Sequence, residues 1–357
     1  MPVTSLPSAA PPAARLSSVE AIRVIAIVAV LCIHAVPFGH ATGRTVVGTT
    51  WDAATVVNQL ARFAVPCFFV LSGVFWGRRT ESPENRWPVT RSTVTRLLLL
   101  FVGWSLVYVF PWEGDRVVPD FPTRWWANVD TNIRWIYRHP WQVLFAGTNG
   151  HLWFLMALAQ ATLIAALFRG RVQDRWLLVL GAALFLVYLL AKPYRGTSLG
   201  LALGFNPRNG PFVSTLFFVL GMRLARRDAT ARWLRYGGGL ALLGLTLSML
   251  ELTWLHAHTR TTLAQDLVVG TIPFGVGMAM VALSGHRWLS HAALASLGTS
   301  VLGIYASHLI FLELLGPIAL RLRSEWWDVA TIGLVFGGSL AMTTLLGRWR
   351  GTRWLVR

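Results

Sequence analysis

The feature that most constrains this chain is a series of ten apolar blocks, separated by short polar or arginine-rich stretches. Each block is about 18 to 24 residues long, which is the length that a helix needs to cross the hydrocarbon core of a bilayer. The blocks predict an all-α fold, a polytopic transmembrane helix bundle. The predicted spans are 18–38, 53–77, 94–112, 151–168, 175–191, 211–225, 234–254, 265–284, 299–319 and 328–347.

Composition supports a membrane protein and argues against a nucleic acid partner. The chain is 54% hydrophobic and 13% charged, whereas soluble domains are roughly 45 to 50% apolar. Its formal net charge is +17, but the basic residues lie between the apolar blocks, where they interact with membrane lipid headgroups and decide orientation. Cys32 and Cys67 both fall inside apolar blocks, so we expect neither a disulfide framework nor a metal site.

The distribution of basic residues predicts that both termini are cytoplasmic. With the N-terminus inside, most of the 32 Lys and Arg residues fall in cytoplasmic segments, as the positive-inside rule requires. Residues 1–15, rich in Pro and Ala, are predicted to be a disordered cytosolic tail, followed by one ten-helix membrane domain over 16–357. Because Lys192 is the one lysine beside many arginines, the sequence indicates a GC-rich bacterial genome and hence the inner or plasma membrane.

The first span carries three ionisable residues that are costly within a membrane. Glu20, Arg23 and His34 lie in LSSVEAIRVIAIVAVLCIHAVPF, and each such group costs about 2.5 to 3.5 kcal/mol on insertion scales. Arg23 and His34 are eleven residues apart, which places them on nearly the same face and about 16 Å apart along the axis. Arg suits phosphate, and His can take up and return a proton near neutral pH. The alternative is a helix-packing Glu–Arg pair with a structural His.

The second span, which contains RFAVPCFFVLSG, predicts an interrupted helix beside a cavity. Arg62 would lie near mid-membrane, and Pro66 should kink or break the helix. Ser72 and Gly73 allow close approach of a backbone or a ligand near the inner face. The functional interpretation is a cavity wall with Arg62; the alternative is a packing helix with Arg62 paired to an acid. The basic loop from Arg78 to Arg96 suits a phosphorylated donor, although topology alone also demands basic residues there.

Two further polar groups lie near outer span ends or within a span. TNGHLWFL provides Asn149, His151 and an interfacial Trp153, and GIYASHLIFLEL provides Tyr305 and His308 on one helix face. Taken alone, a histidine in such a helix is structural more often than catalytic.

Other polar or aromatic residues near the outer side receive no firm role. Glu251 and Asp266 lie near outer span ends, where water is close. The Trp-rich connection over 113–150 suits either the membrane interface or a sugar-binding surface.

These segments together resemble the acyltransferase-3 family of integral membrane acyltransferases, which includes O-antigen and enterobacterial-common-antigen O-acetylases. The first span resembles the opening helix of that family, with Arg23 and His34 at the matching positions. RFAVPCFFVLSG is similar to its second-helix signature, HLWFL to the start of its fourth helix, and GIYASHL to its late GIY-x-x-H element. The four matches are in order and extend from residue 18 to about 310.

The resemblance implies transfer of an acyl group from a cytosolic donor, acetyl-CoA, to a carbohydrate or glycolipid acceptor at the outer face. It implies His34 as the catalytic base, with Arg23 as its essential partner and Glu20 beside it. The expected donor-binding residues are Arg62, Ser72, Gly73, Arg91 and Arg96, and the expected acceptor-binding residues are Asn149, His151, Trp153, Tyr305 and His308.

Two features differ from the family pattern. Glu20 stands where Asp is common, and Arg91 and Arg96 are five residues apart where a closer RxxR pair is usual. We expect no appended esterase-like domain after the last span. Two routes remain open, direct attack of an acceptor hydroxyl activated by His34 or relay through an acyl-imidazole. The rival functions are a transporter or channel with an intramembrane His, Arg and Glu pathway, and a glycan flippase or scaffold.

Overall fold

The computed structural model describes residues 12–39, 47–112, 123–170 and 173–356, and over these ranges it contains helices and no strand. The predicted all-α class is therefore confirmed. The α-helices in chain order are α1 (Pro12–Ala35), α2 (Ala53–Ala61), α3 (Ala64–Arg79), α4 (Arg86–Val107), α6 (Thr123–Arg138), α7 (Pro140–Ala146), α8 (Trp153–Phe168), α9 (Asp174–Ala191), α10 (Pro211–Ala225), α11 (Arg232–Thr259), α12 (Thr271–Leu283), α13 (Ala292–Gly298), α14 (Val301–Leu322) and α15 (Glu325–Arg348). Short 3-10 helices are η1 (Pro83–Asn85), η2 (Gly150–Leu152), η3 (Pro207–Asn209), η4 (Arg287–Leu289) and η5 (Arg353–Leu355).

Each predicted span overlaps at least one α-helix. Within the described ranges, seven helices are long and apolar enough to cross a membrane, judged by length and composition. They correspond to the first, second, fourth, fifth, seventh, ninth and tenth predicted spans. The sixth and eighth are the shorter apolar helices α10 and α12, and the third is α4. The chain is therefore a multi-pass membrane protein, and ten crossings stay a prediction.

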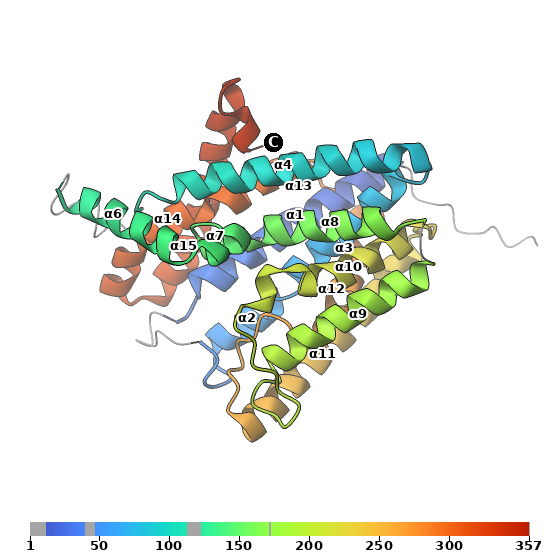
Figure 1. Ribbon diagram of the computed structural model, residues 1–357, viewed down its shortest axis with the longest axis horizontal. Coiled ribbons are helices and arrows are strands. Elements are labelled where there is room, and N and C mark those ends of the chain that lie inside the picture. The colour runs from blue at the N-terminus through green and yellow to red at the C-terminus, as the bar shows by residue number, and fades with distance from the viewer. Residues whose placement is uncertain (1–11, 40–46, 113–122, 171–172, 357) are drawn as a thin grey trace, which may run out of the picture.

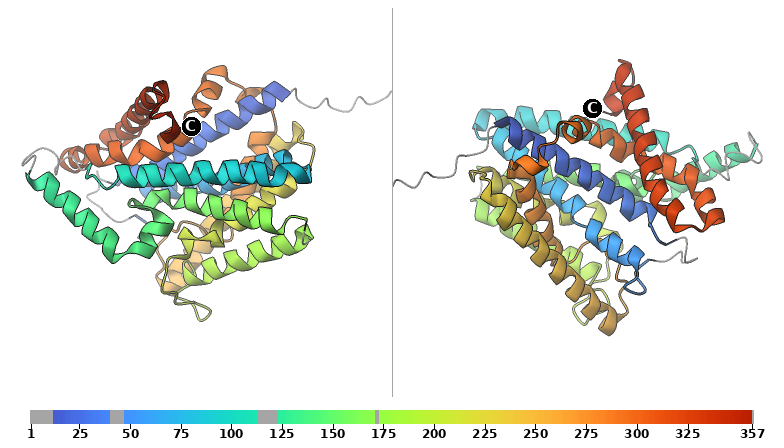
Figure 2. Two further views of the ribbon diagram at one scale, coloured as in Figure 1. Left: turned by 45° about the horizontal axis from the view of Figure 1, so that its top comes forward. Right: turned by 180° about the vertical axis from the view of Figure 1, so that it is seen from behind.

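Helix α1 lies at the centre of the bundle. It packs against α2, α3, α12, α13, α14 and α15, and Figures 1 and 2 show it running through the middle of the molecule. On one side α3 packs against α10, which in turn contacts α8 and α9; elsewhere α4 packs on α8, α11 on α12 and α14 on α15. A polar residue on α1 is therefore enclosed by several neighbouring helices.

The second predicted span is divided into α2 and α3, with the break at Arg62 and Phe63. The break lies one turn before Pro66, because proline has no N–H to donate to the carbonyl of Arg62 and its ring clashes there. The interruption predicted from Pro66 is confirmed. It exposes the end of α2, where Arg62 forms the C-cap, to contacts with other segments.

Helix α3 approaches α10 closely through two reciprocal glycines. A Cβ added at Gly73 would overlap the backbone carbonyl of Phe218, and one added at Gly221 would overlap that of Val70. Small residues at such crossings let backbones pack directly, which is a common way to hold membrane helices together.

Two predicted boundaries are wrong. Helix α4 begins at Arg86, eight residues before the predicted span, so Arg91 and Arg96 lie on a helix and not in a loop. Hydropathy marks only where the apolar stretch begins, whereas the helix continues into its polar flank. The eighth span was expected from 265, but α12 begins at Thr271, and Glu251 accepts hydrogen bonds from the backbone N–H groups of Val269 and Gly270 at this helix start (3.0 and 3.1 Å).

The N-terminal tail is only partly described. Residues 1–11 lie outside the described residues, and α1 already begins at Pro12, inside the segment 1–15 that was expected to be disordered. A proline in the first turn of a helix is well tolerated, because its missing N–H has no partner there in any case.

Arginine-rich connections gather at one end of the bundle. The Arg169 guanidinium, which follows α8, donates to the hydroxyl of Thr80 (2.6 Å) and to the carbonyl of Gly77 (3.3 Å) at the end of α3. Arg226, which follows α10, forms an ion pair with Asp174 at the start of α9. Figure 1 shows these connections at the end where α1 begins.

Candidate active site

Three imidazole rings from distant parts of the chain meet at the far end of α1. His34 lies in the last turn of α1, His151 in η2 before α8, and His308 in α14. The ring centroids of His34 and His308 are 5.2 Å apart, and those of His151 and His308 are 5.1 Å apart. We refer to these three residues as the histidine cluster.

The rings of the histidine cluster differ in accessibility. His151 and His308 are buried, with exposed fractions of 4% and 0%, whereas His34 is exposed. A reacting group must be reached by its substrate, so His34 is the ring best placed for chemistry. The ring of His308 packs against His34, and the ring of His151 packs against His308.

Hydrogen bonds fix the orientation of His308. Its Nδ1 lies 2.6 Å from the carbonyl oxygen of Tyr305, which can only accept, so Nδ1 carries the proton. The other nitrogen, Nε2, is buried and has no partner among the described residues. His308 therefore presents an unprotonated nitrogen within the cluster, suited to accept a hydrogen bond or a proton.

Surrounding residues hold His151 and Tyr305 in place. The Nδ1 of His151 lies 3.2 Å from the side-chain oxygen of Asn149, whose amide donates to Glu313 (3.0 Å). The Tyr305 hydroxyl donates to the backbone carbonyl of His151. Asn149, His151, Tyr305 and His308, predicted from two separate motifs, are thus brought together.

Helix α1 ends immediately after His34 in a strained turn. Val36 has φ of 48°, in the left-handed region that costs a non-glycine residue roughly 1 to 2 kcal/mol, and its N–H donates to the carbonyl of Cys32 (3.2 Å). Pro37 follows and cannot continue the helix. The turn keeps His34 at the very end of α1.

Glu20 and Arg23 form the expected ion pair at the other end of α1. The Arg23 Nη1 lies 2.8 Å from both carboxylate oxygens of Glu20, and both side chains are partly exposed. Arg23 lines a cavity of about 330 Å³ together with Arg79 and Arg96. In the described part of the chain, Arg79 and Arg96 have no ion-pair partner, so this end of the cavity is positively charged.

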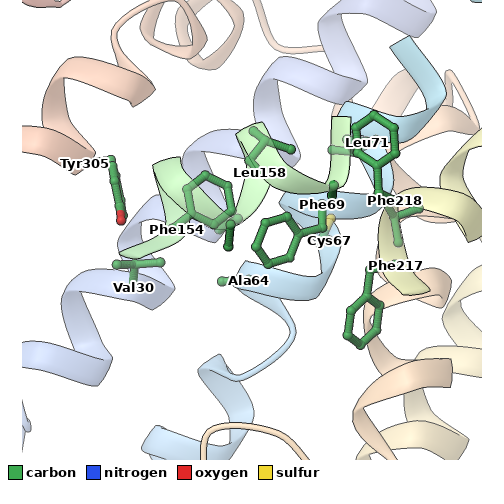
Figure 3. Packing of buried hydrophobic residues seen from close by; sticks show 14 of the residues in the cluster. Val30, Ala64, Cys67, Phe69, Leu71, Phe154, Leu158, Phe217, Phe218 and Tyr305 are labelled. Atoms are coloured by element: carbon green, nitrogen blue, oxygen red, sulfur yellow. The ribbon is translucent and has the colours of Figure 1, made fainter. Parts of the chain in front are cut away.

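The cavity follows one face of α1 toward the histidine cluster. Its wall includes Arg23 and Val30 of α1, and His34 lies one turn beyond Val30. Ser72 of α3 and Tyr305 of α14 also line it. Figure 3 shows Val30 and Tyr305 close to Phe154 in the packed interior. Tyr305 thus touches the cavity on one side and His151 on the other.

A charged network that the sequence did not reveal lies beside His34. Asp266, in the connection between α11 and α12, pairs with Arg62 at 2.7 Å and with Arg208 of η3 at 2.9 Å. Both guanidinium groups and the carboxylate lie close enough to interact electrostatically with His34. Burial alone would raise the pKa of Asp266, but Arg62 and Arg208 outweigh it and lower this pKa to about 2. The carboxylate is therefore charged at neutral pH.

Several predicted ligand positions differ from expectation. Arg62 also donates to Asn58 (3.0 Å) and is paired with an acid, which is the alternative left open for it, and it does not line the cavity. Gly73 faces the backbone of α10 and not the cavity. Trp153 is buried beneath the Arg208 guanidinium (5.3 Å to the ring centroid), so its ring packs inside the protein.

Arg91 and Arg96, predicted as a pair, face different surroundings. Arg96 lines the cavity, whereas Arg91 lines a separate depression of about 420 Å³ beside Trp354, which Arg96 also borders. Five residues along a helix is 500° of rotation, so the two side chains diverge by about 140°. Arg96 is the better placed of the two for a ligand in the cavity.

The arrangement suits proton transfer between a hydroxyl and a leaving group. Exposed His34 can take up a proton, and buried His308 offers a lone pair beside it. Among the described residues, no group of three or more His, Cys, Asp or Glu side chains is arranged to hold a metal ion. A cationic pocket lies at one end of α1 and an imidazole at the other.

The fold and site therefore define a multi-pass helical membrane protein with a cavity lined by arginines and by Tyr305, whose ring lies against His151 of the histidine cluster. The sequence matches the family model described as an acyltransferase domain, that of the acyltransferase-3 family, over residues 16–346. The chain belongs to this family, and the match favours acyl transfer over the transporter and flippase alternatives. No curated protein and no solved structure matches the chain.

Proposed function

We propose that the protein transfers an acyl group, acetyl in the first instance, from a coenzyme A thioester to a hydroxyl of a cell-surface carbohydrate or glycolipid. The observation that carries this proposal is the cavity lined both by Arg23, Arg79 and Arg96 and by Tyr305, whose ring lies against His151 of the histidine cluster. A ligand with an anionic end and an extended reactive arm suits such a cavity.

The phosphates of the donor bind at the arginine end. Arg23 and Arg96 lie close enough to interact electrostatically, and two guanidinium groups held near each other favour an anion between them. The pantetheine arm then follows the α1 face past Val30, with Ser72 in the wall. This path leads the thioester toward Tyr305 and His34.

In direct transfer, His34 removes the proton of the acceptor hydroxyl as its oxygen attacks the thioester carbonyl. The tetrahedral intermediate collapses, the C–S bond breaks, and the imidazolium returns the proton to the coenzyme A thiolate. The free Nε2 of His308, whose ring is fixed by its hydrogen bond to Tyr305, accepts a hydrogen bond from His34 during this reaction and orients it. In the relay route, His34 itself attacks the thioester carbonyl, the C–S bond breaks to release coenzyme A, and the resulting acyl-imidazole then passes its acyl group to the acceptor hydroxyl.

The two routes differ when no acceptor is present. Only the relay transfers label from radioactive acetyl-CoA to the protein in a single turnover without acceptor, and only with His34 intact. Direct transfer leaves the protein unlabelled.

In the proposed orientation, the chain crosses the plasma membrane ten times and both termini lie in the cytoplasm. It is supported by the arginine-rich connections that gather where α1 begins, because basic loops favour the cytoplasmic side. Reporter fusions after residues 38 and 112 should then report the outer side, and fusions after 82 and 228 the inner side. Inverted reporter signals would refute the orientation.

The decisive experiment measures release of free coenzyme A by the purified protein in nanodiscs with labelled acetyl-CoA and extracted surface glycan. The His34→Ala variant should abolish both release and glycan labelling while keeping the unfolding temperature. His258→Ala is the matched control, because His258 lies near an end of α11, stacked on Trp254 and outside the cluster. Full turnover in His34→Ala would refute the proposed role.

A further inference from the structure

A second and larger groove lies at the end of the bundle opposite the arginine-rich connections. It has a volume of about 870 Å³ and runs between the α6–α7 junction and the segment 191–212. Figure 1 shows α7 beside the segment that leads into α10. None of the residues that line this groove also lines the cavity beside Arg23 and Arg96 that we assign to the acyl donor. The groove is therefore a separate site.

The groove carries unpaired positive charge. Arg138, Lys192 and Arg195 line it, and none of the described residues in its wall is acidic. None of these three cations has an ion-pair partner within the described ranges. By contrast Arg134, one turn before Arg138 on the same helix, is paired with Asp130. Cations grouped without carboxylates favour an anionic ligand.

A buried amide oxygen in the groove wall also lacks a partner. Asn209 is 9% exposed and lines the groove, and its Oδ1 has no hydrogen-bond partner among the residues that the structure describes. Buried polar atoms are nearly always hydrogen-bonded, so a donor is expected to reach this oxygen. A ligand hydroxyl or N–H is such a donor, whereas a bare inorganic anion is not.

Aromatic side chains complete the wall. Trp141 and Phe205 line the groove and are 74% and 56% exposed. Broad apolar faces beside polar groups suit a ring that has an apolar face and polar edges. A sugar ring combines these two properties, and a simple ion does not.

The groove adjoins the histidine cluster through η3. Asn209 lines the groove, whereas its neighbour Arg208 points to Asp266 and lies over Trp153. A ligand in the groove is thus separated from the surroundings of His34 by the Arg208 side chain and its partners.

From these observations we propose that the groove binds the acyl acceptor, and that this acceptor is an anionic carbohydrate, a sugar that carries a phosphate or carboxylate. The assignment as acceptor rests on the proposed acyl transfer. Arg138, Lys192 and Arg195 bind the anion, Asn209 accepts a hydrogen bond from a sugar hydroxyl, and the aromatic faces pack on the ring.

Direct binding tests this proposal without reference to turnover. Saturation-transfer NMR titrations compare glucose 1-phosphate with glucose, using the protein in phosphatidylcholine nanodiscs. Wild type should bind the sugar phosphate at least about tenfold more tightly, as expected for one or two charge-assisted hydrogen bonds. The double variant Lys192→Gln/Arg195→Gln should lose this preference. Arg134→Gln, the matched control on a paired cation, should retain it.

Other outcomes would overturn the proposal. Equal affinities for the two sugars, or equal affinity of wild type and double variant for the sugar phosphate, refute the anion site. Loss of sugar phosphate binding in nanodiscs that contain phosphatidylglycerol would identify a lipid headgroup as the ligand and refute the carbohydrate assignment.

The proposal for the groove and the proposal of acyl transfer can be refuted independently of each other. His34→Ala should bind glucose 1-phosphate as wild type does. A wild-type protein that binds it through Lys192 and Arg195 but never releases coenzyme A would refute acyl transfer and support the anion site alone. Normal coenzyme A release without binding of the sugar phosphate would refute the proposal that the groove binds an anionic acceptor.

Discussion

The rings of His34 and His308 lie 5.2 Å apart between centroids although the two residues come from opposite ends of the chain. Because α1 packs directly against α14, the last turn of α1 is held beside the end of the GIYASHL segment. One ring is exposed and the other is fully buried. This asymmetry is what distinguishes a reacting imidazole from a supporting one.

The role of His308 is tested by a variant that keeps half of its interactions. In His308→Asn the side-chain N–H₂ can still donate to the Tyr305 carbonyl, but nothing replaces Nε2. We expect kcat for coenzyme A release to fall by about 100-fold, at the low end for a proton-transfer group, with little change in the unfolding temperature. Partial rescue by His308→Gln, which restores an acceptor further out, would support the assignment. A kcat loss that merely follows loss of stability would contradict it.

Arg96 and Arg91 provide a matched pair on one helix. Arg96 lines the cavity beside Arg23 that we propose for the acyl donor, and Arg91 does not. Arg96→Gln should therefore raise KM for acetyl-CoA by about tenfold, as expected for one charge-assisted hydrogen bond. Arg91→Gln should change KM by no more than about twofold, as expected for an exposed charge. Steady-state kinetics at fixed ionic strength measure both values. Equal effects of the two substitutions would place the donor elsewhere on α4.

Much of this architecture could be predicted from sequence, because the membrane imposes it. Apolar blocks of spanning length locate the long apolar helices, and Pro66 locates the break between α2 and α3. Helix ends were less predictable. The first turns of α4 are polar, and hydropathy carries no signal for a helix that extends beyond its apolar part.

The site was predictable where its residues fall on one helix face or in a short motif. Arg23 and His34 share a face of α1, and Tyr305 and His308 are three residues apart. The role of Asp266 was missed because this residue and its partners Arg62 and Arg208 are distant in sequence and lie in three different connections or helix ends. Such a pairing depends on tertiary structure, and no local periodicity indicates it.

The Asp266 network should contribute measurably to stability. Asp266→Asn keeps the size of the side chain but leaves two partly buried guanidinium groups without a carboxylate. We expect a loss of about 1 to 3 kcal/mol in the free energy of unfolding, together with lower turnover because His34 loses a charged neighbour. Asp174→Asn breaks the more exposed pair with Arg226 and should cost less than about 1 kcal/mol. Thermal unfolding in detergent compares the two, and equal losses would contradict the importance of the network.

The packing of α3 on α10 leads to a prediction at Gly73. An added Cβ would overlap the Phe218 carbonyl, and because that obstacle is backbone, the two helices must separate. We expect Gly73→Ala to lower the free energy of unfolding by about 1 to 3 kcal/mol through overpacking and to reduce turnover by shifting Ser72 in the cavity wall. Gly238→Ala on α11 is the control, because no atom lies within 4 Å of its added Cβ, and alanine there should be neutral or slightly stabilising. If Gly73→Ala kept wild-type stability but weakened acetyl-CoA binding, Gly73 would contact the donor, as the sequence first suggested.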